Sequence, residues 1–422
     1  MSASGALARV AAARAGIQVE AGAHLPQAVD GALRSAELAP RDRGLATEIA
    51  YGTERWRSQL DYALEPHLRR PLSTLEPAVR TLLRQGTYQL LRLSLPAYAV
   101  VDSATEAAQG VGAGRARGLV NAVLRRVAER GLPDLPRDPV RALAVRYAHP
   151  EWLVRRWVEQ LGFEAAQERL RENQETPPLV LRVNRRRAAR DEVLQALPSA
   201  QPVEGLAYAI ELRAAGDVRA LAGYGEGRFQ VQDIGAQAVG EAVGQAGRFA
   251  ELACGRGTKT LQQAERQDGE VIGVDLDARR IREAEQERTR LGLDARFAQG
   301  DAREMAGVLP AQDEVLLDAP CSALGVVRRR PDAKWRRRAQ DLQANGALQA
   351  ELLRAALAVC RSGGVVTYAV CSQEPEETLV PVREVLQDSL ATMIEEPPPL
   401  AQAKAALGYF LPGMYIAQLR QR

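Results

Sequence analysis

The 422-residue sequence predicts an α/β protein with an all-helical N-terminal part, a small α+β middle module and a doubly wound C-terminal domain. Over the first 130 residues, apolar side chains recur every three or four positions without strand-like alternation. From about residue 230, short β-branched runs alternate with helical stretches, which is typical of a parallel sheet covered by helices. We therefore expect domains at residues 1–134, 135–229 and 230–422.

Composition excludes several classes of protein. With 46% hydrophobic and 26% charged residues, the chain is an ordinary globular protein rather than a disordered one. No stretch approaches the roughly 20 apolar residues of a membrane span, and the N-terminus lacks a signal-like apolar core, so we expect a cytoplasmic location. Four cysteines without a C-x-x-C pair argue against a metal site and a disulfide framework.

The helical part contains amphipathic stretches at residues 75–91 and 119–127. Residues 1–134 carry 17 basic and 13 acidic side chains, a net charge of +4 that would suit a polyanionic partner. Three prolines within residues 131–139 predict a linker. The middle module is expected to open with a helix around Trp152–Asn173, followed by a strand at Leu179–Val183.

The C-terminal domain offers five candidate strands with connecting helices. An order of 3-2-1-4-5 would make this a Rossmann-like sheet with its ligand at the carboxyl edge. The strands are expected at residues 249–253, 271–275, 295–298, 314–318 and 365–370.

A glycine-containing loop follows the first of these strands and precedes a helix. Glycine allows the backbone to approach a ligand at such a turn, and Asp275 and Asp301, after the next two strands, could contact a ribose and an adenine. Thr260 stands where a dinucleotide fingerprint needs glycine, and a Walker A loop is absent. A nucleoside cofactor without pyrophosphate, such as S-adenosylmethionine, fits better, with an ordinary tight turn as the alternative. The loop residues are Ala253, Cys254, Gly255, Arg256, Gly257, Thr258 and Lys259.

Two cysteines follow neighbouring strands. Asp318-Ala-Pro-Cys321 ends the fourth strand and Tyr368-Ala-Val-Cys371 ends the fifth, so both thiols should lie at the same edge of the sheet. A thiolate that adds to carbon 6 of a pyrimidine makes carbon 5 nucleophilic enough to accept a methyl group, and a second group must then assist elimination. The alternatives are buried packing or a disulfide. For Cys254 and Cys360 we favour packing, Cys254 in the loop and Cys360 in a helix core.

A basic run lies between the fourth and fifth strands. Residues 328–338 carry seven basic side chains and one acid, although residues 230–422 have a net charge of −3. Because the run follows Cys321 closely, we expect it beside the active edge and in contact with RNA; a solvated face is the alternative. The candidate RNA-binding residues are Arg328, Arg329, Arg330, Lys334, Trp335 and Arg336.

With these motifs in hand, residues 230–422 resemble the RNA 5-methylcytosine methyltransferases of the NOL1/NOP2/Sun family. The motifs are the loop 253–259, Asp318-Ala-Pro-Cys321, residues 325–335 and Val370-Cys371-Ser372 with Pro375-Glu-Glu377. The N-terminal part is similar to the NusB family, through Asp42-Arg43, Leu60-Asp61, residues 86–91 and residues 118–125. The combination is similar to bacterial enzymes that methylate 16S ribosomal RNA.

The resemblance implies roles for individual residues. Cys371 would be the nucleophile, Cys321 would assist product release, and Asp318 would contact the cytosine and lie near S-adenosylmethionine. Asp275 would hold the ribose, Asp301 the adenine, and Lys259 would anchor the loop. The helical part would bind RNA, and we expect a monomer.

The sequence differs from the family pattern at two positions of the cofactor loop and at one place near the C-terminus. Arg256 replaces a proline and Thr258 replaces the second glycine, which bears on cofactor affinity. Residues 411–419 lack the usual Asp-Gly, so that end of the substrate cleft is expected to differ.

Other functions remain open on the sequence alone. The chain would be a non-catalytic RNA-binding module if the methyltransferase body were degenerate, although retention of Cys321, Cys371 and Asp318 argues against this. A tRNA cytosine-5 methyltransferase would carry the same motifs. An amino-group methyltransferase would tend to end its fourth strand in Asn/Asp-Pro-Pro-Tyr/Phe rather than in cysteine.

Overall fold

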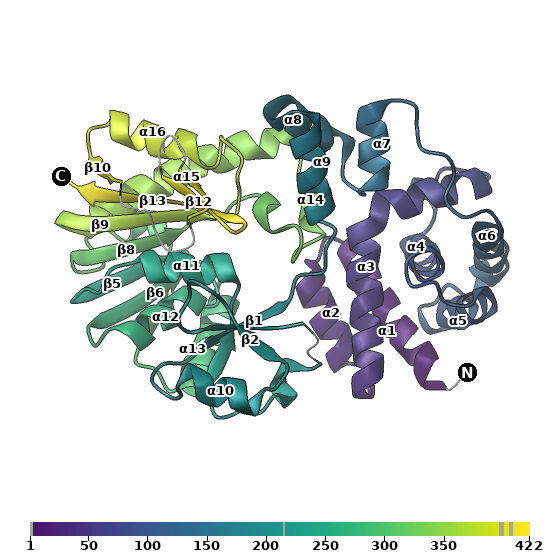
Figure 1. Cartoon of the computed structure of the whole chain (residues 1–422), viewed down its shortest axis with the longest axis horizontal. Coiled ribbons are helices and arrows are strands. Elements are labelled where there is room, and N and C mark those ends of the chain that lie inside the picture. The colour runs from purple at the N-terminus through teal and green to yellow at the C-terminus, as the bar shows by residue number, and fades with distance from the viewer. Residues whose placement is uncertain (1–2, 214–215, 396–400, 405–407) are drawn as a thin grey trace. The chain divides into compact units, whose positions relative to one another are not determined.

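The computed structural model describes residues 3–213, 216–395, 401–404 and 408–422, and it divides into two compact units. The helical unit comprises Met1–Thr176 together with Val327–Arg337. The sheet unit comprises Pro177–Val326 and Arg338–Arg422. The division differs from the three-part organisation expected from the sequence, because residues 135–176 pack with the N-terminal helices (Figure 1).

The helical unit contains no strand within its described residues, as the apolar spacing predicted. Proline at the first or second position begins several of its helices, where the missing N–H costs nothing. Its helices are α1 (Ala3–Glu20), α2 (Leu25–Arg34), α3 (Pro40–Leu64), α4 (Pro77–Leu91), α5 (Ala97–Gly110), α6 (Arg117–Arg130), α7 (Pro139–Arg146), α8 (Glu151–Leu161), α9 (Phe163–Glu172) and the short α14 (Ala333–Arg336).

Small residues let the helices of this unit approach closely. A Cβ at Gly52 of α3 would collide with the ring of Tyr88 on α4, and one at Gly86 of α4 would lie 2.5 Å from a methyl group of Leu124 on α6. An alanine-rich α1 packs against α2 and α3 for the same reason. The predicted linker is the irregular segment between α6 and α7.

The expected single helix at Trp152–Asn173 is wrong, because it is two helices. Gly162 adopts a φ of 83°, a conformation that glycine tolerates and that ends α8 before α9 begins. The strand predicted at Leu179–Val183 is present as β1.

The sheet unit begins with a small antiparallel sheet in the order β2-β3-β1-β4. It is packed around a core that includes Leu181, Ile210 and Phe229. Its elements are β1 (Leu179–Val183), α10 (Arg190–Ala196), β2 (Ala200–Pro202), β3 (Ala209–Leu212) and β4 (Phe229–Val231).

The large sheet runs in the order β11-β12-β13-β9-β8-β5-β6-β7, and β10 pairs with β13. Its five parallel strands follow the predicted 3-2-1-4-5 order, which confirms the Rossmann-like fold. The elements are α11 (Ile234–Ala242), β5 (Arg248–Leu252), α12 (Thr258–Arg266), β6 (Glu270–Asp275), α13 (Ala278–Leu291), β7 (Arg296–Gln299), β8 (Gln312–Asp318), α15 (Ala339–Val359), β9 (Cys360–Val370), α16 (Leu379–Gln387), β10 (Ala391–Ile394), β11 (Ala403–Lys404), β12 (Tyr409–Leu411) and β13 (Met414–Gln421).

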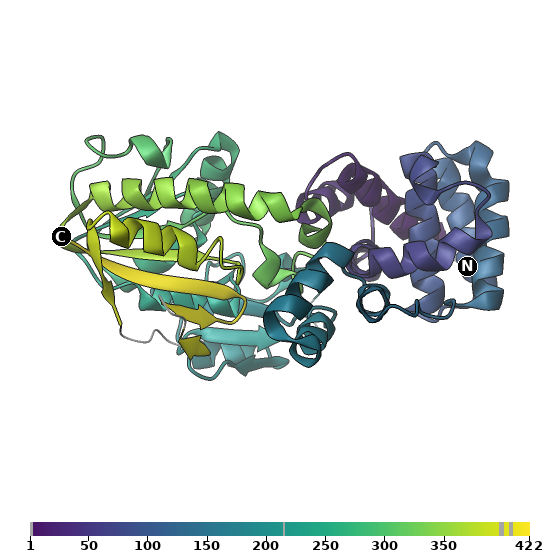
Figure 2. The ribbon, with the colours of Figure 1, turned by 90° about the horizontal axis from the view of Figure 1, so that it is seen from above.

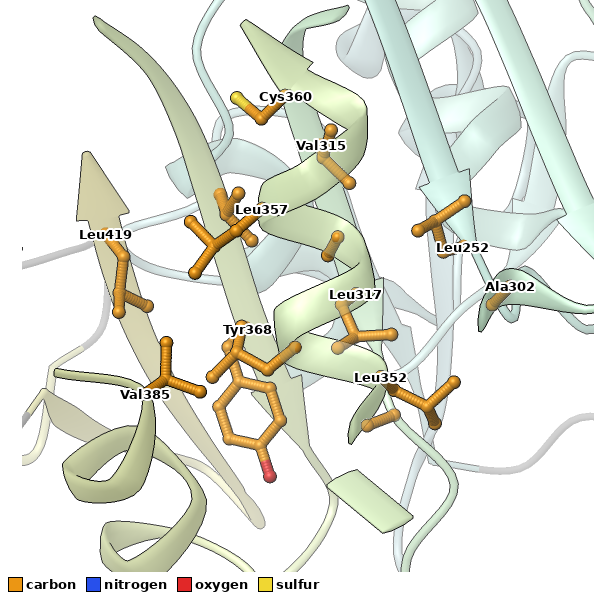
Figure 3. Packing of buried hydrophobic residues seen from close by; sticks show 14 of the residues in the cluster. Leu252, Ala302, Val315, Leu317, Leu352, Leu357, Cys360, Tyr368, Val385 and Leu419 are labelled. Atoms are coloured by element: carbon orange, nitrogen blue, oxygen red, sulfur yellow. The ribbon is translucent and has the colours of Figure 1, made fainter. Parts of the chain in front are cut away.

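Successive side chains of the central strands enter cores on opposite faces of this sheet. On β8, Val315 and Leu317 pack beneath α15 and α16, whereas Leu316 packs with α11, α12 and α13. Figure 2 shows α15 and α16 lying over the strands, and Figure 3 shows Val315, Leu317 and Tyr368 meeting Leu357 and Val385. With both faces covered, ligands can reach the parallel strands only at their ends.

The location expected for Cys360 is wrong. α15 ends at Val359, and Cys360 begins β9, where it is buried in the core beneath α15. β9 is also longer than expected, because Gly363 and Gly364 continue it past a register shift opposite Gln312 and Glu314.

Candidate active site

The two predicted active-site cysteines meet at the carboxyl edge of the sheet. β8 and β9 pair in parallel with Asp318 opposite Ala369, so the residues after each strand emerge side by side. Cys321 Sγ and Cys371 Sγ lie 3.2 Å apart, well beyond an S–S bond, and both residues are half-buried thiols. The predicted juxtaposition is confirmed, and the disulfide alternative is not what the structure contains.

A buried carboxylate that the sequence analysis gave no role joins the two cysteine loops. Glu377 accepts hydrogen bonds from Ser322 N (2.7 Å) and Ser322 Oγ (2.5 Å), and also from Asn345 Nδ2 (2.7 Å). Tyr368 OH donates to Glu377 O (2.6 Å), and Gly325 N donates to Cys371 O (3.1 Å). The position of Cys321 relative to Cys371 is therefore fixed by a network rather than by the strands alone.

Asp318, before the first cysteine, forms an ion pair with Lys259 of α12. Lys259 Nζ lies 2.5 Å from Asp318 Oδ2, and the lysine side chain is only 8% exposed. Burial lowers the pKa of Lys259, but attraction to Asp318, Glu251 and Cys371 outweighs it and leaves that pKa raised. A permanent ammonium near Cys371 favours the thiolate form of that cysteine.

Glu251, on β5, is a second carboxylate that the sequence analysis did not consider. It is 1% exposed and accepts a hydrogen bond from Thr260 Oγ1. Burial raises its pKa to about 7, although Lys259 and Thr260 oppose the shift. An acidic residue inside the otherwise apolar stretch Phe249–Leu252 of β5 was the available signal in the sequence.

The expected cofactor loop leaves β5 and enters α12. Ala253, Gly255 and Gly257 all have φ between 58° and 69°, so the chain turns tightly at the strand end. A Cβ at Gly257 would lie 2.5 Å from the ring of Phe297, whereas one at Gly255 would meet open space. Only a residue without a side chain fits at Gly257, and the backbone at Gly255 stays accessible.

The two loop residues that depart from the family pattern, Arg256 and Thr258, each contact a residue outside the loop. Arg256 pairs with Glu283 of α13 at 2.7 Å, and Thr258 starts α12 and offers its carbonyl to Arg182 at 3.0 Å. Cys254 is buried, with its pKa raised first by burial and then by Glu251 and Asp275, as expected for packing rather than chemistry.

Asp275 and Asp301 follow β6 and β7 at the same edge. Asp275 Oδ2 accepts from Gly255 N (2.8 Å) and Oδ1 accepts from Asp277 N (2.9 Å). Each carboxylate oxygen has a second lone pair, which suits ribose hydroxyls. Asp301 is held by Arg303, whose hydrogen bonds lower its pKa to about 2. An open loop backbone beside a buried carboxylate fits a nucleoside cofactor such as S-adenosylmethionine.

The predicted placement of the basic run is wrong for part of it. Val327–Arg337 packs as part of the helical unit, and Lys334 is fully buried there with Nζ donating to Arg55 O at 3.0 Å. Burial and the nearby Arg55 lower the pKa of Lys334 well below its usual value. A buried ammonium that already donates to the backbone is unsuited to binding phosphate.

The other members of the run differ in exposure. Trp335 Nε1 donates to Glu54 O (2.7 Å), which fixes the indole, and Arg328 pairs with Glu175 at 3.2 Å. Arg336 is exposed and donates to Gly22 O and Ala23 O. Arg329 is half-buried and Arg330 is exposed, so these side chains remain candidates for RNA contact.

Within the described part of the chain, no three metal-ligating side chains gather, and no helix is long and apolar enough to span a membrane.

Comparison with known proteins finds matches to three parts of the chain. Residues 245–416 match the family model described as 16S rRNA methyltransferase RsmB/F, residues 3–129 match the NusB family, and residues 149–219 match the RsmF/B-like ferredoxin-like domain. Ribosomal RNA small subunit methyltransferase B of Pseudomonas putida KT2440 is 38% identical over 402 residues, which cover 90% of this chain and 88% of the relative. The enzyme of the same name from Escherichia coli O6:K15:H31 is 35% identical, with 83% of each chain covered.

Solved structures share the fold at lower identity. The crystal structure of PH0851 covers 100% of both chains with a TM-score of 0.85 and 21% identity. NSun6 from Pyrococcus horikoshii, crystallised with SFG, covers 64% of this chain and 98% of its own, with a TM-score of 0.56 and 19% identity.

Proposed function

Because this chain belongs to the RsmB/F family of 16S rRNA methyltransferases, we propose that it methylates carbon 5 of a cytosine in 16S ribosomal RNA through a covalent cysteine–cytosine intermediate. S-adenosylmethionine is the cofactor. The observation that carries the proposal is the 3.2 Å separation of Cys321 Sγ and Cys371 Sγ beside Asp318.

Cys371 is the nucleophile. Its thiolate, favoured by the nearby Lys259 ammonium, adds to carbon 6 of the cytosine, and the new C–S bond makes carbon 5 electron-rich. S-adenosylmethionine, when bound, supplies the methyl group that carbon 5 accepts. Removal of the carbon 5 proton then drives cleavage of the C–S bond, and Cys371 leaves as a thiolate.

Cys321 assists the release step. Its hydrogen bond with Cys371, its burial and the charges of Cys371 and Glu377 raise its pKa well above the usual value. A thiol with a raised pKa stays protonated while Cys371 attacks. Once Cys321 has released that proton to solvent, its thiolate is a strong base that takes the proton from carbon 5 as the C–S bond breaks. The two cysteines therefore have different tasks although their sulfur atoms touch.

Asp318 and the cofactor loop hold the reactants. Asp318 accepts a hydrogen bond from the exocyclic amine of the cytosine while Lys259 keeps its carboxylate oriented. The loop 253–259 and Asp275 hold the cofactor, with Asp301 at the adenine. The NusB-like helices and the exposed arginines of the basic run bind the RNA.

Bisulfite sequencing of 16S ribosomal RNA and tRNA from cells with and without the gene tests the proposal. We expect one cytosine of 16S RNA to resist bisulfite conversion in wild-type cells and to be converted in the deletion strain. The wild-type gene should restore the resistance to conversion, and the Cys371→Ala gene should not. Loss of protection in tRNA instead would reassign the substrate. No change at any cytosine would overturn the methyltransferase proposal in favour of a binding module.

A further inference from the structure

Arg182 of β1 is a buried cation that joins the small antiparallel sheet to α12. Its side chain is 1% exposed, and that of its ionic partner Glu265 is fully buried. The guanidinium uses all five of its N–H groups on four acceptor residues, Glu265, Gln230, Gln232 and Thr258. A planar guanidinium bound on every side has one orientation, so it can fix the groups that it holds.

The ion pair with Glu265 does not by itself account for an arginine at this position. Burial raises the pKa of Glu265, although Arg182 opposes the shift. Taking two charges out of water offsets much of their attraction, and a well-packed apolar pair of similar volume often gives equal stability. What an apolar pair could not replace is the donation by the remaining N–H groups of Arg182.

One of those N–H groups reaches the cofactor loop. Arg182 Nη1 donates to Thr258 O at 3.0 Å, and Thr258 is the first residue of α12, directly after the tight turn at Gly257. A carbonyl at the start of an α-helix accepts from the N–H four residues further on, so the Arg182 bond is additional to those of the helix. The contact therefore acts on the position of the loop rather than on the formation of α12.

A second connection holds the same face of α12. Thr258, Gln262 and Glu265 are spaced by four and three residues, which places them on one side of the helix. Gln232 accepts a hydrogen bond from Arg182 and donates through Nε2 to Gln262 Oε1 at 2.8 Å. Arg182 is thus bonded to α12 at three successive points, directly or through Gln232, and the helix cannot slide or rotate without breaking these bonds.

Lys259 carries this restraint into the active site. It follows Thr258 on the chain, its Nζ lies 2.5 Å from Asp318 Oδ2, and its charge acts on Cys371. A displacement of the first turn of α12 would move both the loop backbone and this ammonium, and a shift of about 1 Å in a reacting group is costly.

We propose that Arg182 is a positioning residue, which from the small antiparallel sheet fixes the loop 253–259 for S-adenosylmethionine and the backbone that carries Lys259. The inference rests on the proposed function in that this loop holds the cofactor. It gives the small sheet a task in methyl transfer besides its own packing.

The test measures binding of S-adenosylmethionine to the full-length protein by isothermal titration calorimetry. Arg182→Lys keeps a cation beside Glu265, but a single ammonium cannot reproduce the fork that also reaches Thr258 O. We expect Kd to rise about tenfold, because a hydrogen bond from a charged donor is lost next to the loop. An unchanged Kd in a folded Arg182→Lys protein would overturn the proposal.

Arg290→Lys is the matched control. Arg290 of α13 also holds the small sheet, since it donates to Tyr224 O and to Phe229 O, and it pairs with Glu287. These acceptors lie outside the loop 253–259. Thermal unfolding compares the stability of the two variants, and Arg290→Lys should keep the wild-type Kd. An equal rise of Kd in both would assign the effect to a loosened small sheet and refute the role of Arg182.

A double variant separates position from buried charge. Arg182→Met/Glu265→Met removes both charges and leaves neither one buried without a partner, so the protein should fold. It should bind S-adenosylmethionine as weakly as Arg182→Lys does, because Thr258 O has lost its donor. Wild-type affinity in the folded double variant would contradict the proposal.

Hydrogen exchange of the cofactor-free protein gives a readout without ligand. Amides of residues 254–260 should exchange faster in Arg182→Lys than in Arg290→Lys, whereas those of β9 should keep wild-type rates in both. Equal exchange of the loop in the two variants would count against the proposal. Neither assay reads methylation, so a Cys371→Ala protein that still methylated would refute the proposed mechanism and leave the result for Arg182 untouched.

Discussion

The buried carboxylate of Glu377 accepts hydrogen bonds from both the backbone N–H and the hydroxyl of Ser322, at 2.7 and 2.5 Å. Ser322 directly follows Cys321, and Glu377 lies six residues after Cys371 on the chain. The bond pair therefore ties the loop of one cysteine to that of the other, across 55 residues of sequence.

Glu377→Gln is expected to lower kcat by roughly one to two orders of magnitude, because a displacement of about 1 Å in a reacting group can cost that much. The glutamine amide would set an N–H against one of the donors Ser322 N, Ser322 Oγ or Asn345 Nδ2. KM for S-adenosylmethionine should stay unchanged, since the cofactor loop is not part of this network. Steady-state kinetics separate the two constants.

The control for this variant is Glu384→Gln on α16, which alters only a surface pair with Arg354 at 3.8 Å. Such pairs contribute little to stability. An unchanged kcat in Glu377→Gln would show that the strands alone position Cys321.

The two cysteine variants should fail at different steps. Cys371→Ala removes the nucleophile and should abolish methylation, whereas Cys321→Ala should leave an RNA–protein adduct that survives a denaturing gel. The adduct forms because attack still occurs but elimination slows. Labelled 16S RNA incubated with S-adenosylmethionine gives the measurement.

Cys360→Ala is the matched control, since Cys360 is a buried thiol of the same sheet unit that contacts neither sulfur. It should methylate and leave no adduct. The double variant Cys321→Ala/Cys371→Ala should also give none; an adduct in that protein would assign the covalent bond to another residue.

The sequence predicted the features that depend on local pattern. Alternation of strands and helices was enough for the 3-2-1-4-5 order, and the order was enough to bring Cys321 and Cys371 to one edge. Strand β1 was predicted to the residue, because four apolar residues and Arg182 lie between a proline pair and a polar turn.

Features that depend on distant partners were not predictable in this way. In the run 328–338 the charges look alike in sequence, and only packing against α3 shows that Lys334 is buried while Arg330 is exposed. The roles of Glu251 and Glu377 likewise arise from Thr260, Lys259 and Ser322, which no local pattern joins to them.

The raised pKa of Glu251 predicts a pH-dependent stability. Its pKa is about 7 in the folded protein against 4.5 unperturbed, so the folded state binds the extra proton more tightly. The stabilisation is complete below pH 4.5 and is lost as the pH rises to about 7. A shift of this size corresponds to roughly 3 kcal/mol, an upper bound because Lys259 is coupled to it.

Urea unfolding at several pH values between 5 and 8 measures this slope. As the pH rises from 5 to 8, the free energy of unfolding of the wild-type protein should fall relative to that of Glu251→Gln. The glutamine side chain has no proton to release in this pH range. Glu241→Gln, a more exposed change in the same unit, serves as control. Parallel pH profiles for wild type and Glu251→Gln would contradict the assignment.

The basic run predicts a contrast between exposed and buried cations in RNA binding. Each phosphate contact contributes about 0.7 to 0.9 to the slope of log affinity against log salt concentration. Arg330→Ala should therefore weaken RNA binding and reduce that slope by about one contact, because Arg330 is exposed. Lys334→Met should leave the slope unchanged, since the Lys334 ammonium donates to Arg55 O inside the helical unit. Filter binding of 16S RNA at 50 to 300 mM salt gives both slopes, and thermal unfolding shows that Lys334→Met folds. A reduced slope in Lys334→Met would mean that the segment Val327–Arg337 leaves the helical unit when RNA binds.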